Sequence, residues 1–112
     1  MKRYAQTVLL KDDPEIIARY EHYHASAWPE TLAGLRNSGV VRMFIYRWGR
    51  QLFMFMETVD EFDLERDMPQ YMANPRAREW DELMKTFQEP PPGAPVGSTW
   101  ALMREVFALD SK

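Results

Sequence analysis

Two periodicities of apolar residues divide the chain into strands and helices. Alternation rich in β-branched and aromatic residues predicts strands at residues 3–10, 40–48, 51–58 and 99–107. Apolar residues at helical spacing, bounded by capping signals, predict helices at residues 14–25, 29–37, 61–68 and 75–88. With consecutive helices counted together, the order is βαββαβ. This order is that of the ferredoxin-like α+β fold, a four-stranded antiparallel sheet with helices on one face.

Capping residues set the expected helix boundaries. Asp13, Asp60 and Asn74 each precede a predicted helix and offer a side-chain oxygen to its free backbone amides. Gly39 follows the second helix and suits the left-handed conformation that ends one. Pro69 is expected to disturb the end of the third helix, because proline removes a backbone donor.

The segment 89–98, EPPPGAPVGS, is expected to form a loop, since its prolines exclude both helix and central strand. A structureless stretch of this length in a short chain is typical of a lid or a binding segment.

Both faces of the predicted sheet carry large apolar side chains. In strand 51–58, Phe53, Phe55 and Glu57 point to one side, and the alternate residues point to the other. Strand 40–48 likewise separates its aromatic residues from Val41, Met43 and Ile45. A sheet that is apolar on both faces must cover the second one, and the simplest cover is the same face of another copy. We therefore predict a homodimer in which two sheets close into a dimeric α/β barrel.

Composition and charge narrow the class of protein. A chain of 112 residues, 46% of them hydrophobic, predicts a single ordered domain spanning 1–112. The net charge is -3 and no basic tract exceeds two residues, so no nucleic-acid partner is expected. No apolar run approaches the ~18 residues of a membrane span, and the start lacks a signal-peptide pattern, so no membrane partner is expected. The absence of cysteine fits a cytoplasmic protein.

The first helix concentrates aromatic and histidine side chains. Tyr20 and His24 lie four residues apart, so they share a stripe that Ile16 and Ile17 begin, and this stripe is expected to face the sheet. His22 points elsewhere. His24 lies near the helix C-terminus, where the dipole favours the protonated imidazole. The pattern fits a packed aromatic pair, which is the commoner arrangement, and it also fits a histidine that transfers protons.

No metal site is predicted. His22 and His24 lie on different faces of the helix, and the chain has neither a third histidine nor a cysteine. Asp12 and Asp13 suit helix capping better than binding of Mg²⁺ or Ca²⁺.

The motif Y-x-x-x-H-x-x-x-W-P-E, from Tyr20 to Glu30, resembles the opening motif of the L-rhamnose mutarotase family. The segments GVVRMFIYRWGRQLFMFMETVDEFD, NPRAREWDELM and MREVFAL are similar to that family's central hairpin, tryptophan segment and last strand. The resemblance covers essentially the whole chain.

This resemblance implies a dimeric ferredoxin-like barrel that uses neither metal nor organic cofactor and interconverts the α and β anomers of 6-deoxy-L-sugars. Position by position, Tyr20 matches a substrate-binding tyrosine, His24 the proton donor, and Trp80 the first of two tryptophans that contact the monosaccharide. Two positions depart from the rhamnose enzymes. Met43 replaces a substrate-contacting tyrosine, and Asp81 replaces the second tryptophan.

Such departures can change the specificity of a hydrogen-bonded sugar site. The stretch FQEPPPGAP…W, with its Pro-rich loop ahead of the last strand, resembles the branch that serves L-fucose and favours L-fucose over L-rhamnose. Mutarotation needs an acid and a base, and histidine suits both roles near neutral pH. Trp28 is a further candidate for lining the pocket, or an anchor at the helix junction. The partner base is open between Glu57, Glu105 and Asp81.

Other classes of protein share the predicted fold. A cofactor-free monooxygenase, a lactone isomerase and a non-catalytic metabolite-sensing dimer are the alternatives. An RNA-binding module of this topology would need an exposed basic, aromatic sheet surface, and the net charge argues against it.

Overall fold

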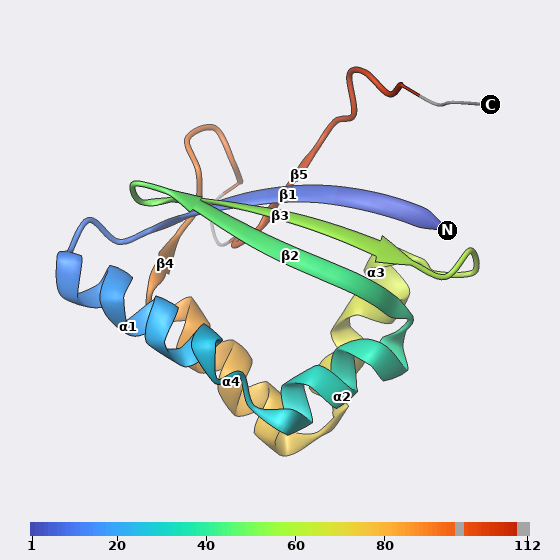
Figure 1. Ribbon diagram of the computed structural model, residues 1–112, viewed down its shortest axis with the longest axis horizontal. Coiled ribbons are helices and arrows are strands. Elements are labelled where there is room, and N and C mark those ends of the chain that lie inside the picture. The colour runs from blue at the N-terminus through green and yellow to red at the C-terminus, as the bar shows by residue number, and fades with distance from the viewer. Residues whose placement is uncertain (96–97, 110–112) are drawn as a thin grey trace.

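The computed structural model, which describes residues 1–95 and 98–109, consists of one antiparallel sheet with helices on one side of it (Figure 1). The strands are β1 (Lys2–Leu10), β2 (Val40–Trp48), β3 (Gln51–Thr58), β4 (Gln88–Glu89) and β5 (Ala101–Met103). Their order is β2-β3-β1-β4, and β5 also pairs with β1. Central β1 with β2 beyond β3 is the ferredoxin-like arrangement, so the predicted fold is confirmed.

The hairpin of β2 and β3 has the predicted boundaries. Phe44 pairs with Phe55 and Tyr46 with Phe53, while a bulge between Val40 and Arg42 shifts the register at the start of β2. Paired residues share a face, so the aromatic side chains of both strands gather on one side of the sheet.

The last strand is shorter than predicted. Only Ala101–Met103 pairs with β1, opposite Ala5 to Thr7, whereas a strand over 99–107 was expected. Beyond it the chain runs on away from the helices (Figure 1), and the apolar side chains of Val106 and Phe107 are 89% and 78% exposed. Alternation therefore marked a segment of which residues 104–107 find no strand partner among the described residues.

Local capping explains three of the helices. They are α1 (Pro14–Ala25), α2 (Pro29–Ser38) and α4 (Pro75–Lys85). The side chain of Asp13 accepts a hydrogen bond from the Glu15 amide, and that of Asn74 accepts one from the Arg76 amide. Gly39 ends α2 with φ 111°, the left-handed conformation predicted for it.

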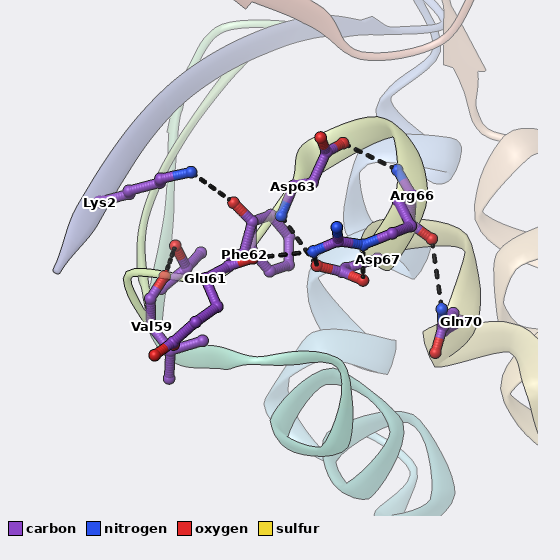
Figure 2. Close-up of polar contacts among 9 residues, drawn as sticks. Lys2, Val59, Glu61, Phe62, Asp63, Arg66, Asp67 and Gln70 are labelled. Atoms are coloured by element: carbon purple, nitrogen blue, oxygen red, sulfur yellow. Dashed lines mark hydrogen bonds and ion pairs between the residues drawn. The ribbon is translucent and has the colours of Figure 1, made fainter.

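The third helix differs from the prediction. It is α3 (Leu64–Asp67), followed by the 3₁₀ helix η1 (Met68–Ala73), rather than one helix over 61–68 capped by Asp60. Asp63 is the cap: its carboxylate accepts from the Arg66 amide, and Asp67 accepts from the Asp63 amide (Figure 2). Lys2 Nζ donates to the Phe62 carbonyl at 2.7 Å and holds the preceding loop against β1 (Figure 2). Asp60 instead pairs with the N-terminal amine at 2.8 Å.

The fourth helix ends at Lys85, three residues earlier than predicted. Gln88 and Glu89 pair with Leu10 and Leu9 of β1 and form β4. Strand pairing thus takes the last residue of the predicted helix, Gln88, and the first residue of the predicted loop, Glu89. Residues 90–95 and 98 form no helix or strand, and residues 96–97 of the loop lie outside the described residues.

The two faces of the sheet have different surroundings. Leu52, Met54 and Met56 of β3 are buried against the helices. On the opposite face, here called the open face, Tyr46 is 60% and Trp48 88% exposed. Within the described residues, no helix is long and apolar enough to cross a membrane.

Candidate functional site

A cavity of about 680 Å³ lies between the helix-covered face of the sheet and the helices. Its floor is formed by side chains of β1, β2 and β3, among them Gln6, Met43 and Met54. Its walls come from α1, α2, η1 and α4. Five of the six predicted site residues line it, namely Tyr20, His24, Met43, Trp80 and Asp81.

Tyr20 and His24 are brought together by one turn of α1. Their rings stack with centroids 4.2 Å apart, and Tyr20 is only 3% exposed, as the inward stripe predicted. The His24 Nδ1 atom lies 3.0 Å from the backbone oxygen of Tyr20. Because a carbonyl oxygen only accepts, Nδ1 carries the proton, and the neutral ring keeps its lone pair on Nε2. His22 is exposed, as predicted.

Burial decides the charge state of both groups. It lowers the pKa of His24 from its ordinary value of 6.5, and the hydrogen bond to the Tyr20 carbonyl opposes this only in part. The helix dipole was expected to favour the protonated ring, whereas burial favours the neutral ring and the pKa is lowered. Burial also raises the pKa of Tyr20, against a smaller opposing effect of a hydrogen bond from Gln88. At neutral pH the pair is therefore an uncharged imidazole beside an uncharged phenol.

Trp80 is the residue of α4 whose ring contacts His24 of α1. Its indole is 5% exposed and meets the His24 ring edge-on, with centroids 5.1 Å apart. Trp28 packs on the indole of Trp80 at 5.3 Å, and the guanidinium of Arg76 lies 4.0 Å from the Trp28 ring centroid. Trp28 does not line the cavity and supports Trp80, as a residue at the helix junction does.

Asp81 is held by two donors. The Tyr71 hydroxyl donates to Oδ1, and Lys85 Nζ lies 2.9 Å from Oδ2. Burial, followed by the hydrogen bond and the negative charge of Asp81, raises the pKa of Tyr71, so the phenol stays protonated. Each carboxylate oxygen therefore accepts from one protein donor and keeps a further lone pair.

Glu57 and Glu105, the other two candidate bases, lie away from the cavity. Glu57 projects from the open face and accepts from the guanidinium of Arg42. Glu105 pairs with Arg3 at 2.6 Å, beyond the end of β5. The prediction that either could act as the base is wrong, because neither lines the cavity and both project away from the helix-covered face of the sheet.

Seven polar residues that line the cavity were not predicted: Gln6, Thr31, Glu65, Tyr71, Lys85, Gln88 and Thr99. Lys85 has a sequence signal, since it follows Asp81 by four residues and therefore lies on the same helix face. Tyr71 and Gln88 have none. Tyr71 lies in η1, between two predicted helices, and Gln88 lies in β4, which takes the end of a predicted helix.

The polar groups of the cavity suit a small ligand rich in hydroxyls. Uncharged imidazole, phenol and amide groups donate and accept hydrogen bonds, and the indole of Trp80 offers an apolar surface. In the described residues, no group of three or more histidine, aspartate or glutamate side chains could hold a metal ion. The fold and the cavity thus define a small α+β protein with a histidine-containing ligand site.

Comparison with known proteins identifies the family. The sequence profile described as L-rhamnose mutarotase matches residues 3–109. An L-fucose mutarotase of Xanthomonas campestris pv. campestris is 33% identical over 111 residues, which cover 97% of this chain and 89% of the relative. The chain belongs to the L-rhamnose mutarotase family, a family of isomerases.

Other relatives agree on length and fold. A UPF0734 protein of Dictyostelium discoideum is 37% identical over 113 residues, covering 97% of this chain and 90% of the relative. The crystal structure of an L-rhamnose mutarotase from Formosa agariphila superposes with a TM-score of 0.69 at 23% identity, covering 98% of this chain and all of that one. Tetracenomycin F2 cyclase from Streptomyces glaucescens, a type-II polyketide cyclase, has a TM-score of 0.58 at 16% identity, with coverage of 98% and 100%. At these identities the two structures show a common fold.

Proposed function

We propose that this protein interconverts the α and β anomers of a 6-deoxy-L-hexose, with L-fucose preferred over L-rhamnose. The observation that carries the proposal is the neutral His24, whose Nδ1–H is fixed by the Tyr20 carbonyl inside the cavity. Membership of the family supports the reaction, and the relative named L-fucose mutarotase supports the choice of sugar.

His24 transfers the proton in both half-reactions. As the neutral ring, its Nε2 accepts the proton of the anomeric hydroxyl while the bond between the anomeric carbon and the ring oxygen breaks. The imidazolium then donates that proton to the ring oxygen, which gives the open aldehyde. Both oxygens are bonded to the same carbon, so one imidazole reaches them in turn. Closure on the other face of the aldehyde reverses the steps.

The other predicted site residues bind the sugar. Tyr20, uncharged, hydrogen-bonds a hydroxyl close to the anomeric carbon, and Trp80 packs on the apolar face of the ring. Met43 offers a thioether from the sheet floor, which favours contact with carbon over contact with hydroxyls. The reaction requires no metal or cofactor, since it only moves a proton between two oxygens and breaks and re-forms one ring bond.

The test is proton NMR saturation transfer between the anomeric signals of L-fucose and of L-rhamnose. His24→Ala should lower the protein-catalysed exchange rate by about 10²-fold or more, the usual contribution of a general acid–base group. His22→Ala is the matched control, because it removes an exposed histidine of the same helix and should leave the rate unchanged. An undiminished rate in His24→Ala protein would exclude His24 as the proton carrier.

We further propose that two copies associate through the open face and work as a cytoplasmic homodimer. Phe44, Tyr46 and Trp48 are 45%, 60% and 88% exposed in the single chain, and Val106 and Phe107, which follow β5, are 89% and 78% exposed. A contiguous apolar surface of this kind is uncommon on a monomer. A second copy of the same face matches it, since paired aromatic rows are self-complementary about a twofold axis. The absence of cysteine supports the reducing compartment.

A further inference from the structure

We propose that Tyr71 and Lys85, joined through Asp81, bind the sugar hydroxyls opposite the anomeric carbon and thereby determine which 6-deoxy sugar is accepted. The inference rests on the proposed function, because it assigns the second end of the same cavity. It adds two residues, Tyr71 and Lys85, that were not among the predicted site residues.

The three side chains form one connected group at the wall of the cavity. Asp81 and Lys85 lie one turn apart on α4, and Tyr71 reaches them from η1. All three line the cavity that contains His24. Asp81 uses one oxygen for each neighbour, so it fixes the phenol and the ammonium relative to each other.

Each partner keeps hydrogen-bonding capacity for a ligand. The Tyr71 oxygen donates its proton to Asp81 and retains lone pairs that accept from a sugar hydroxyl. The Lys85 ammonium, half-exposed, has further N–H donors beyond the one directed at Asp81. An acceptor and a donor held side by side match two neighbouring hydroxyls of a sugar.

The group lies next to Trp80, the residue whose ring contacts His24. His24 contacts the ring of Trp80, whereas Asp81 is the next residue along α4 and projects about 100° around the helix from it. A pyranose with its anomeric carbon at His24 and its face on Trp80 turns its C3 and C4 hydroxyls away from His24. L-fucose and L-rhamnose differ in configuration at C2 and C4, so contacts at this end discriminate between them.

Discrimination follows from the cost of leaving polar groups unpaired. Tyr71 is partly buried, and its oxygen loses contact with water when a sugar fills the cavity. A sugar whose hydroxyl points elsewhere leaves the lone pairs of that oxygen without a donor, although its own proton still goes to Asp81. An unpaired buried acceptor of this kind is a strong basis for rejecting a close analogue.

The test combines Tyr71→Phe with 3-deoxy- and 4-deoxy-L-fucose. For L-fucose, the substitution should lower kcat/KM and binding affinity about 3- to 10-fold, the effect of one net hydrogen bond. For the deoxy sugar that lacks the hydroxyl bound by Tyr71, wild type and variant should perform equally. Lys85→Met, at a half-exposed position that tolerates change, should show the same cancellation with one of the two sugars.

Tyr23→Phe is the matched control. Tyr23 stacks on Phe87 near the site but does not line the cavity. Its substitution should therefore change kcat/KM and affinity by the same factor for L-fucose and for both deoxy sugars. Equal losses with every sugar in both Tyr71→Phe and Lys85→Met would show that these residues only hold α4 against η1, and would overturn the inference. Because binding is measured by titration alongside exchange, a wild-type protein that binds sugar without exchanging its anomers would refute the proposed function instead.

Discussion

The helix α2 lies close to η1 at Gly34, and replacing this glycine by alanine tests how the contact between the two elements shapes the cavity. A Cβ atom at Gly34 would lie 2.4 Å from the backbone oxygen of Tyr71, whereas ordinary contact begins at 3.4 Å. The two elements must therefore move about 1 Å apart. The obstacle is a backbone carbonyl, which cannot rotate out of the way as a side chain does.

Two effects of the substitution oppose each other. Alanine is favoured over glycine inside a helix by about 0.8–1.0 kcal/mol. Overpacking costs about 1–3 kcal/mol, and a backbone obstacle belongs at the upper end of that range. The expected net result is a loss of about 1–2 kcal/mol in the free energy of unfolding, or roughly 4–8 °C in Tm for a domain of this size.

Urea unfolding and calorimetry measure this loss, and Ala33→Gly calibrates it. Ala33 is exposed in the same helix, so its substitution reports the propensity difference without a clash. The steric cost is the destabilisation by Gly34→Ala plus that by Ala33→Gly. If Gly34→Ala stabilised the protein by as much as Ala33→Gly destabilises it, the close approach of α2 and η1 would be refuted. Because η1 carries Tyr71, Gly34→Ala should also raise KM more than it lowers kcat.

Two further predictions concern the acid–base group and the dimer. Burial lowers the pKa of His24 below 6.5, so the unfolded chain takes up this proton at a higher pH than the folded chain does. The contribution of His24 to stability is full above pH 6.5 and declines as the pH falls toward the lowered pKa, and catalysed exchange should fall with it. Urea unfolding and saturation transfer, each measured over a pH series on wild type and His24→Gln, check this. A decline at acid pH that is unchanged in the variant would contradict the assignment to His24. Tyr46→Glu places a charge on the open face and should convert the dimer to monomer at micromolar concentration in sedimentation velocity. Arg78→Glu, at an exposed position on α4, is the control and should leave the dimer intact. Wild-type protein that sediments as a monomer would refute the dimer.

Local signals were sufficient for most element boundaries. Asp13 and Asn74 cap the helices predicted for them, and Gly39 ends α2, because each acts on backbone groups within a few residues. Alternation likewise separated the two faces of β2 and β3 correctly, since side-chain direction in a strand is a property of the backbone. The stripe that turned Tyr20 and His24 inward follows from the helical period in the same way.

Where two local sequence patterns compete, the tertiary structure decides which of them prevails. Asp60 and Asp63 both suit an N-cap, and the choice of Asp63 accompanies the bond from Lys2 to the Phe62 carbonyl and the pairing of Asp60 with the N-terminus. Gln88 fits a helix by pattern but pairs with β1 instead. In these cases residues far apart in sequence supplied the deciding contact.

The site shows the same division. The sequence by itself determined that His24 and Tyr20 share an inward stripe of one helix and that the chain belongs to the L-rhamnose mutarotase family. Only the tertiary structure decided which face of the sheet the helices cover, and so excluded Glu57 from the cavity. It alone brought Tyr71 to Asp81, because η1 takes its course from packing against α2 and α4. Periodicity fixes the direction of a side chain within its own element, whereas the partner that it meets depends on how distant elements pack.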